Sequence, residues 1–192
     1  MFFHDSIVNR TNHHTLLGVT FDDKLTFKDH ISNLVLKLSR IVSLFYQIRE
    51  LMPKDILRIM YNSHILPHLQ YCTPIWCSTY PTHLLPLFRI QKKVIRIITN
   101  SDFLAHTRPL FKDTKVLNLF DLNKYQIAIY TYNLLHNQNI EIAHNYPTRT
   151  RDNLRIPIHS LTLFKHSLAY LGPKTWNSIP NQIKKHTNNT FF

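Results

Sequence analysis

The chain has 192 residues, of which 44% are hydrophobic and 18% are charged, a balance typical of globular rather than disordered proteins. Its formal net charge of +12 favours a polyanionic partner, with nucleic acid before an anionic membrane surface. The sequence holds two glycines, which excludes a Walker A loop, a dinucleotide-binding fingerprint and a nucleophile elbow.

The positive charge is concentrated in the second half of the chain. Residues 84–192 carry 15 basic and five acidic side chains, whereas residues 1–83 carry eight and six. Two cysteines provide no disulfide framework, which favours a reducing compartment, either nucleus or cytoplasm. The start MFFHDSIVNR does not resemble a secretory signal, and no apolar run is long enough to cross a bilayer. We therefore expect an intracellular protein without a membrane partner.

The first predicted elements are a strand and a long helix. LLGVTF, residues 16–21, is rich in β-branched and aromatic side chains and ends at a pair of aspartates, which indicates a strand entering a turn. Thr26 to Asp29 is typical of a capping box, with an acid placed to reach back to the first amide. Apolar residues then recur at three- and four-residue spacing up to Ile48, which predicts an amphipathic helix.

Three further helices are predicted. The second begins at Pro53, whose missing N–H costs nothing at a first helical position, and runs toward Tyr71 with Pro67 as a kink or stop. The third covers about residues 82–99. The fourth covers about residues 119–137, and its predicted apolar face consists of Leu122, Tyr125, Ile129, Tyr132 and Leu135.

The pattern changes near the end of the fourth helix. Residues 136–157 are polar, basic and without periodicity, which indicates a linker. LTLFKHSLAYLG, residues 161–172, has extended character, and two short helical turns separated by Pro180 follow it. The predicted fold is therefore mainly α, a helical bundle with a short N-terminal strand and a small basic C-terminal module. Its expected divisions are residues 1–25, 26–138 and 139–192.

The most specific local signal is a basic stripe on the third helix. Four cations at positions i, i+3, i+4 and i+7 share one helical face, namely Arg89, Lys92, Lys93 and Arg96. The opposite face is apolar, and no acidic residue occurs between Asp55 and Asp102. A helix that docks by its apolar face can use such a stripe to bind a phosphate backbone without reading its sequence. The alternative is a solvated outer face with no ligand.

A second basic cluster lies in the linker. It consists of Arg149, Arg151 and Arg155, near the aromatic ring of Tyr146. Guanidinium groups beside an aromatic ring in a linker suit single-stranded or hybrid nucleic acid. An ordinary surface loop explains the same composition equally well.

One pair of carboxylates invites a catalytic interpretation. Asp22 and Asp23 are adjacent, and paired carboxylates bind the metal ions of nucleotidyl transfer. A third carboxylate is needed on another strand, and the preceding residues offer only Asp5. The favoured interpretation is a turn before a helix.

One group of residues has the chemistry of a zinc site. His64, His68, Cys72 and Cys77 are zinc-type ligands, and the first three could share one helical face. However, Pro67 interrupts the run, and the stretch is otherwise apolar. A buried helix with partly exposed histidines is favoured, and we predict neither a metal nor a cofactor.

Four segments, each weak alone, are specific in their order and spacing. The first is LLGVTFDDKLTFKDHI, where the matching residues are Gly18, Asp22, Leu25 and His30. The second is ILPHLQYCTPIWCSTYP, with Pro67, Tyr71 and Trp76. The third is RIQKKVIRIITNSDFLAHTRPLF, with Gln91, Lys92, Lys93, Arg96, His106, Thr107, Leu110 and Phe111. The last combines Thr148-Arg149 with YLGPKTWNSIP, where Gly172, Pro173, Trp176, Asn177 and Pro180 match.

Together these segments, over about residues 15–190, resemble the region after the catalytic palm in reverse transcriptases of jockey-like non-LTR retrotransposons. The resemblance implies a thumb and a C-terminal connection, which hold the template–primer duplex. RNA, DNA or an RNA–DNA hybrid is then the expected partner, bound through its phosphates. The palm and fingers of a parent polymerase are a second expected partner.

The resemblance also implies what the chain cannot do. We expect the fingers, the palm and the Asp-Asp hairpin that binds catalytic metal to be absent, so the chain is not expected to polymerise. The family's basic helix after TNNTFF is also expected to be missing. The chain departs from the family pattern at Phe27, Cys77 and Val94, where tryptophan, glycine and alanine are usual. Alternative hypotheses are an inert structural remnant and a metal-dependent nuclease.

The resemblance gives both glycines structural roles. Gly18 is expected to relieve a close approach of the strand to its neighbour, and Gly172 to form a turn ahead of Pro173. Trp76 and Trp176 complete the set of structural motif residues.

Overall fold

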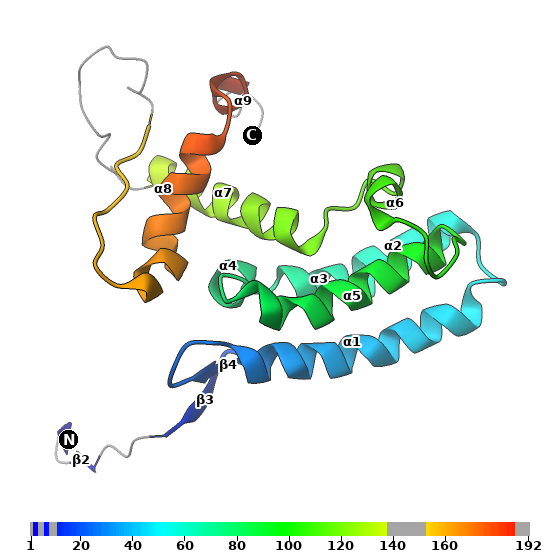
Figure 1. Ribbon diagram of the computed structural model, residues 1–192, viewed down its shortest axis with the longest axis horizontal. Helices are drawn as coiled ribbons and strands as arrows, with labels where there is room; N and C mark the ends of the chain where they lie inside the picture. Colours follow the sequence, from blue (N-terminus) through cyan, green and yellow to red (C-terminus); the bar gives the residue numbers. More distant parts are fainter. Residues whose placement is uncertain (1, 4–5, 8–10, 138–152, 187–192) are drawn as a thin grey trace. The chain divides into compact units, whose positions relative to one another are not determined.

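The computed structural model describes residues 2–3, 6–7, 11–137 and 153–186. It is mainly helical, which confirms the predicted fold class (Figure 1). Among the described helices, none is both long and apolar enough to span a bilayer. In chain order the elements are β1 (Phe2–Phe3), β2 (Ser6–Ile7), β3 (His13–Leu16), β4 (Val19–Asp22), α1 (Lys28–Ile48), α2 (Lys54–His64), α3 (Leu66–Gln70), α4 (Thr73–Trp76), α5 (Pro81–Ile98), α6 (Thr107–Asp113), α7 (Leu119–Asn137), the 3₁₀ helix η1 (Thr162–His166), α8 (Leu168–Ser178) and α9 (Asn181–His186).

The chain forms two compact units. The first comprises Met1–Cys72 and Thr79–Leu119, and the second comprises Thr73–Ser78 and Phe120–Phe192. The first unit therefore contains the β3–β4 hairpin, helices α1, α2, α3, α5 and α6. The second contains α4, α8, α9 and all but the first residue of α7.

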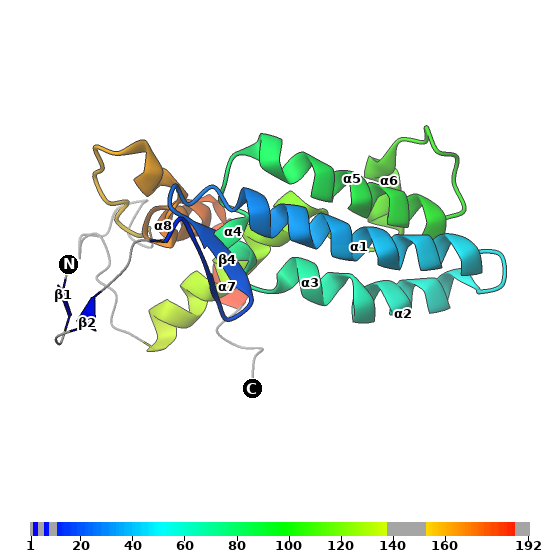
Figure 2. The same ribbon diagram turned by 90° about the horizontal axis from the view of Figure 1, so that it is seen from below.

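The first unit is built around the packing of α1 against α5. These two helices lie side by side and run in the same direction (Figures 1 and 2). In chain order α2 and α3 come between them and carry the chain back in the opposite direction. The buried residues of α1 include Ile31, Leu38 and Phe45, spaced seven apart. The buried residues of α5 include Leu84, Leu87, Val94, Ile95 and Ile98. The apolar faces that the spacing predicts for these two helices are thus confirmed.

Prolines shape the path from α1 to α5. The prediction of one helix from Pro53 toward Tyr71 is corrected in two ways. Pro53 lies one position before the helix, in an extended conformation, and α2 begins at Lys54. The helix is then interrupted at Ile65. Pro67 occupies the first turn of α3, where a backbone N–H would have no partner within the helix, so its absence costs no hydrogen bond.

The prediction of a single strand at residues 16–21 is wrong, because the segment turns back on itself. Strands β3 and β4 pair antiparallel, and the last pair joins Leu16 to Val19. The two residues between them both have positive φ, 48° at Leu17 and 80° at Gly18. This is the backbone of a tight two-residue hairpin turn, which favours glycine. A Cβ on Gly18 would meet nothing within 4 Å, so the glycine provides backbone conformation rather than room for a neighbour.

The start of α1 depends on Asp22 rather than on a capping box. Phe27 precedes the helix with a left-handed φ of 54°, and no side chain caps the first turn. The Asp22 carboxylate instead accepts hydrogen bonds from the Thr26 amide at 3.0 Å, the Thr26 hydroxyl at 2.9 Å and the Phe27 amide at 2.7 Å. Asp29, predicted to reach back to the first amide, pairs with the His13 ring at 3.1 Å.

We expect Asp22→Asn to lower the free energy of unfolding by about 1–2 kcal/mol at neutral pH, because an amide nitrogen cannot replace the second acceptor oxygen. Burial raises the pKa of Asp22, but the hydrogen bonds from Thr26 and Phe27 outweigh it and hold the pKa below the ordinary 3.8. The carboxylate's contribution is therefore complete above that value and is lost as the pH falls through the folded-state pKa. Urea unfolding at several pH values measures the effect. The difference from wild type should close in acid, whereas an equal loss with Asp102→Asn, which changes an exposed aspartate elsewhere in the first unit, would contradict the assignment.

The second unit corrects the predictions for the C-terminal region. Residues 161–172, expected to be extended, form η1 and the first half of α8. Gly172 makes no turn: it is buried within α8, and a Cβ there would lie 2.9 Å from the Thr131 hydroxyl oxygen on α7. The glycine lets α8 approach α7. The expected helical turns on both sides of Pro180 are present as the end of α8 and as α9.

Asn177 ties α8 to the segment before η1. Its side-chain oxygen accepts from the Leu154 amide at 2.8 Å, and its side-chain nitrogen donates to the Leu154 carbonyl at 2.9 Å. Trp176, on the same helix, is half-buried, and its ring centroid lies 6.3 Å from that of Tyr132. Trp76 is fully buried. These matched residues therefore serve packing and backbone pairing in the second unit.

Candidate nucleic-acid interface

The basic stripe lies on α5, opposite the buried face of that helix. Arg89 and Lys93 are exposed, and neither pairs with an acidic side chain of the described residues. Lys92 and Arg96 are half-buried. The arrangement leaves four cations on one side of a helix whose other side is fixed in the core, as the spacing predicts. Whether these cations bind a ligand stays a prediction.

Lys92 and Arg96 also make contacts within the protein. The Lys92 ammonium lies 4.3 Å from the ring centroid of Phe88, one turn earlier on α5. The Arg96 guanidinium donates from Nε and Nη2 to the Ala105 carbonyl oxygen, at 3.0 and 2.9 Å. Arg96 thus anchors the loop between α5 and α6, and its remaining N–H groups keep a positive charge beside that loop.

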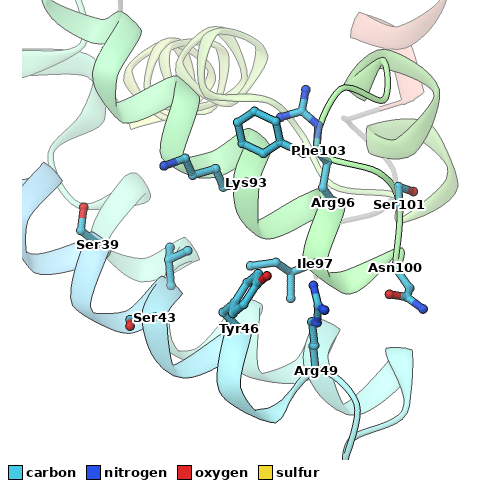
Figure 3. Close-up of a pocket in the computed structure, with 11 residues that line it drawn as sticks. Ser39, Ser43, Tyr46, Arg49, Lys93, Arg96, Ile97, Asn100, Ser101 and Phe103 are labelled. Atoms are coloured by element: carbon cyan, nitrogen blue, oxygen red, sulfur yellow. The ribbon is translucent and has the colours of Figure 1, made fainter.

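A groove runs beside the stripe, between the C-terminal halves of α1 and α5. It has a volume of about 450 Å³, and no acidic residue lines it (Figure 3). Its lining residues come from three places. They are Ser39, Val42, Ser43 and Tyr46 on α1 with Arg49 directly after it, Lys93, Arg96 and Ile97 on α5, and Asn100, Ser101 and Phe103 in the loop that follows α5. Because α1 and α5 are parallel, their C-terminal ends lie beside each other, and the groove forms between these two ends.

Arginines lie next to the two aromatic rings of the groove. The Arg49 guanidinium carbon is 4.4 Å from the ring centroid of Tyr46, and the Arg96 guanidinium carbon is 6.0 Å from that of Phe103. Tyr46 is 59% exposed and Phe103 is 74% exposed, so ligands can reach both rings. Arg49 also donates to Glu50 at 3.2 Å. Since Glu50 is 78% exposed, this pair contributes little free energy and does not remove Arg49 from use.

The sequence reasoning missed Arg49, Tyr46 and Phe103. Arg49 stands alone among uncharged or acidic neighbours in sequence, and only the packing of α1 against α5 brings it to Lys93 and Arg96. A partial signal is the pairing of an aromatic with a basic residue three positions later, Tyr46 and Arg49, at the end of the predicted helix.

The linker cluster is described only in part. Arg149 and Arg151, with Tyr146, lie outside the described residues. Arg155 is exposed in the second unit and follows Leu154, whose backbone is hydrogen-bonded to Asn177. It lines a cavity of about 380 Å³ that is otherwise mainly apolar. A role for Arg155 in nucleic-acid binding stays a prediction.

The carboxylate and zinc candidates differ in what surrounds them. Both carboxylate oxygens of Asp22 accept hydrogen bonds from the loop before α1, which confirms the preferred interpretation of a turn acid.

Within the described residues, no group of three or more histidine, cysteine, aspartate or glutamate side chains could hold a metal ion. Cys77 belongs to a different compact unit from His64, His68 and Cys72. Burial raises the pKa of the Cys77 thiol to about 12, which disfavours the thiolate that a metal requires.

Comparison with curated proteins finds two relatives from Drosophila melanogaster. A probable RNA-directed DNA polymerase from transposon X-element is 29% identical over 113 residues, which covers 57% of this chain. An RNA-directed DNA polymerase from mobile element jockey is 26% identical over 162 residues, which covers 74%. The aligned parts are 12% and 17% of those two proteins. No family model and no solved structure matches the chain. The resemblance to polymerases of non-LTR retrotransposons is thus confirmed.

Proposed function

We propose that this chain is a segment of the RNA-directed DNA polymerase of a non-LTR retrotransposon, and that it binds nucleic acid without reading its sequence. The proposal starts from the similarity to two mobile-element polymerases, although the chain spans only a small part of their length. Their names describe DNA polymerases that RNA directs. The partner proposed for this chain is therefore RNA, DNA or a hybrid of the two, held through the phosphates.

The observation that carries the proposal is the basic stripe on α5. Arg89, Lys92 and Lys93 form a line of positive charge on a helix that the core holds rigidly. The phosphate groups along a strand are also arranged in a line, so several of them can contact these cations at once. Each cation that neutralises a phosphate releases a counterion, which favours binding. Arg96 has a double role in the proposal: it fixes the loop through Ala105 and adds a fourth cation. Arg149, Arg151 and Arg155 are proposed as a second, separate contact with the nucleic acid.

We also propose that the chain contributes binding rather than chemistry. The paired carboxylates that invited a catalytic interpretation include Asp22, whose oxygens accept three hydrogen bonds in the loop before α1. A carboxylate that ties its own loop is poorly placed to bind the metal ions of nucleotidyl transfer. In this proposal the catalytic metals are bound by another part of the polymerase.

A second proposed partner is that remaining part of the polymerase. Two adjacent leucines at the turn end of the β3–β4 hairpin are strongly exposed, Leu16 at 56% and Leu17 at 80%. Adjacent exposed leucines at a hairpin turn suit contact with an apolar surface. An alternative is an inert remnant without any partner, in which the same leucines promote aggregation; a soluble chain that binds oligonucleotides would contradict it.

The test removes charge from the stripe while keeping Arg96 and its loop. We expect the triple variant Arg89→Gln, Lys92→Gln, Lys93→Gln to bind a single-stranded or duplex oligonucleotide at least about tenfold more weakly at low salt. The slope of log affinity against log salt should fall by about 2–3, because three phosphate contacts are lost. Fluorescence anisotropy over a salt series measures both quantities.

A matched control separates the stripe from net charge. The triple variant Lys37→Gln, Lys54→Gln, Arg58→Gln removes three exposed cations from α1 and α2 and leaves α5 intact. It should change affinity and salt slope much less than the α5 variant. Equal changes in the two variants would show that only total charge matters and would overturn the assignment to α5.

A further inference from the structure

We propose that the groove between α1 and α5 binds single-stranded nucleic acid by stacking an unpaired base on Tyr46 or Phe103. This inference rests on the proposed function and specifies the class of ligand that the groove would select. The stripe alone would hold any phosphate backbone. The groove adds a reason to prefer a strand whose bases are accessible.

Positive charge enters the groove from both helices. Arg49 follows the last residue of α1, Arg96 lies in the last turn of α5, and Lys93 lies nearly one turn earlier on α5. Part of this charge offsets the negative ends of two parallel helix dipoles. Lys93 stands farther from the helix end and pairs with no acidic side chain of the described residues. Its charge is available for a phosphate group.

The two aromatic rings line the same groove as Lys93, so a base attached to a phosphate bound there could reach them. Tyr46 comes from α1 and Phe103 from the loop after α5, and both line the groove beside Arg49, Lys93 and Arg96 (Figure 3). Exposed rings beside arginines are the arrangement on which bases stack in single-strand binding proteins, since every base has a π face. In a duplex the base faces are covered by neighbouring pairs, so this contribution is available only to an unpaired strand.

The polar groups of the groove fit a nucleotide without selecting a base. Ser39, Ser43 and Ser101 offer hydroxyl groups, and Asn100 offers an amide, around an apolar floor of Val42 and Ile97. Short hydroxyl side chains bond equally to phosphate and sugar oxygens. Arg96 holds the loop that carries Phe103, so that ring is positioned before a ligand arrives. The site is therefore expected to be tolerant of sequence.

The experiment compares two ligands that differ only in their bases. A labelled oligothymidine and an abasic oligomer of equal length carry the same phosphates, and both are titrated against the full chain. We expect oligothymidine to bind about tenfold more tightly, because stacking adds to the phosphate contacts that both ligands share. The double variant Tyr46→Ala, Phe103→Ala should lose this preference while its affinity for the abasic oligomer stays within about twofold of wild type.

A remote aromatic residue provides the control. Tyr80, 53% exposed at the opposite end of α5, is replaced by alanine and should leave the preference unchanged. Equal affinities of wild type for the two ligands, or a preference that survives the double variant, would overturn the groove assignment and leave the stripe in place. Failure of wild type to bind either ligand would overturn the groove and the proposed function together.

Discussion

Replacing Gln91 with methionine is expected to lower the free energy of unfolding of the first unit by about 4 kcal/mol. Gln91 is 1% exposed and meets three partners. Its side-chain nitrogen donates to the Tyr61 hydroxyl and to the Leu117 carbonyl, both at 2.9 Å, and its side-chain oxygen accepts from the Leu119 amide at 2.8 Å. Methionine matches the size of glutamine but leaves the Tyr61 hydroxyl and the Leu119 amide without this partner in the core, at about 1–3 kcal/mol each, while the Leu117 carbonyl is only part-buried.

The partners of Gln91 provide the control. Burial raises the pKa of Tyr61 to about 12, an effect that the hydrogen bond from Gln91 partly opposes, so the phenol is neutral at physiological pH. Tyr61→Phe removes one of the three bonds and should cost about 1 kcal/mol in the wild-type background. In the Gln91→Met background it should cost less, because the hydroxyl has already lost this donor. Urea unfolding followed by far-UV circular dichroism measures all four proteins. A loss below about 1 kcal/mol for Gln91→Met would contradict the network.

Gly172→Ala is expected to destabilise the second unit by about 2–3 kcal/mol, although alanine favours helices. The new Cβ would lie 2.9 Å from the Thr131 hydroxyl oxygen. That oxygen cannot turn away freely, because Thr131 is 3% exposed and its hydroxyl donates to the Ile127 carbonyl at 2.8 Å. The helices must therefore separate, or the threonine must leave its rotamer.

The sign of the Gly172 effect should reverse when Thr131 is shortened. In a Thr131→Ala background the obstructing oxygen is gone, and Gly172→Ala should stabilise by up to about 1 kcal/mol through helix propensity. Both tryptophans of the chain belong to the second unit, so tryptophan fluorescence during urea unfolding reports on this unit. Destabilisation of equal size in both backgrounds would show that the approach to Thr131 is not the cause.

The two glycines show where sequence reasoning succeeds and where it fails. Both positions were predicted to be structurally demanding, and both are. Their roles are exchanged: Gly18 forms a turn and Gly172 admits a neighbouring helix. A glycine followed by a proline is typical of a turn, and only the packing of α8 against α7 places Gly172 inside a helix. Local sequence identifies the constraint, whereas tertiary contacts determine its kind.

Helix faces were predictable only where polar residues interrupt the apolar ones. The spacing on α1 and α5 predicts their buried faces, because charged and hydroxyl residues mark the outer side. On α7 the apolar residues surround the helix, and the predicted face is wrong in part. Tyr125 and Ile129 are exposed, whereas Ile127 and Thr131 are buried.

The candidate site was predictable in the same uneven way. The four cations of the stripe lie on one helix and follow from its period. The groove joins Arg49 and Tyr46 to residues about fifty positions later, and no periodicity within one helix can reveal such a juxtaposition. Gln91 was recognised as part of a matched segment, but its three hydrogen-bond partners come from two other parts of the first unit, Tyr61 on α2 and the segment from Leu117 to Leu119.

The parallel packing of α1 and α5 also limits the order in which the first unit can fold. Two helices that run in the same direction cannot form a hairpin, so the chain must return along α2 and α3 before α5 can dock. During synthesis, Ile31, Leu38 and Phe45 therefore emerge before α5, the helix that α1 packs against. Docking of α5 closes a long loop and must follow the local formation of α1 and α2. The interval between the two events is the period in which this unit is most exposed to aggregation or capture by a chaperone.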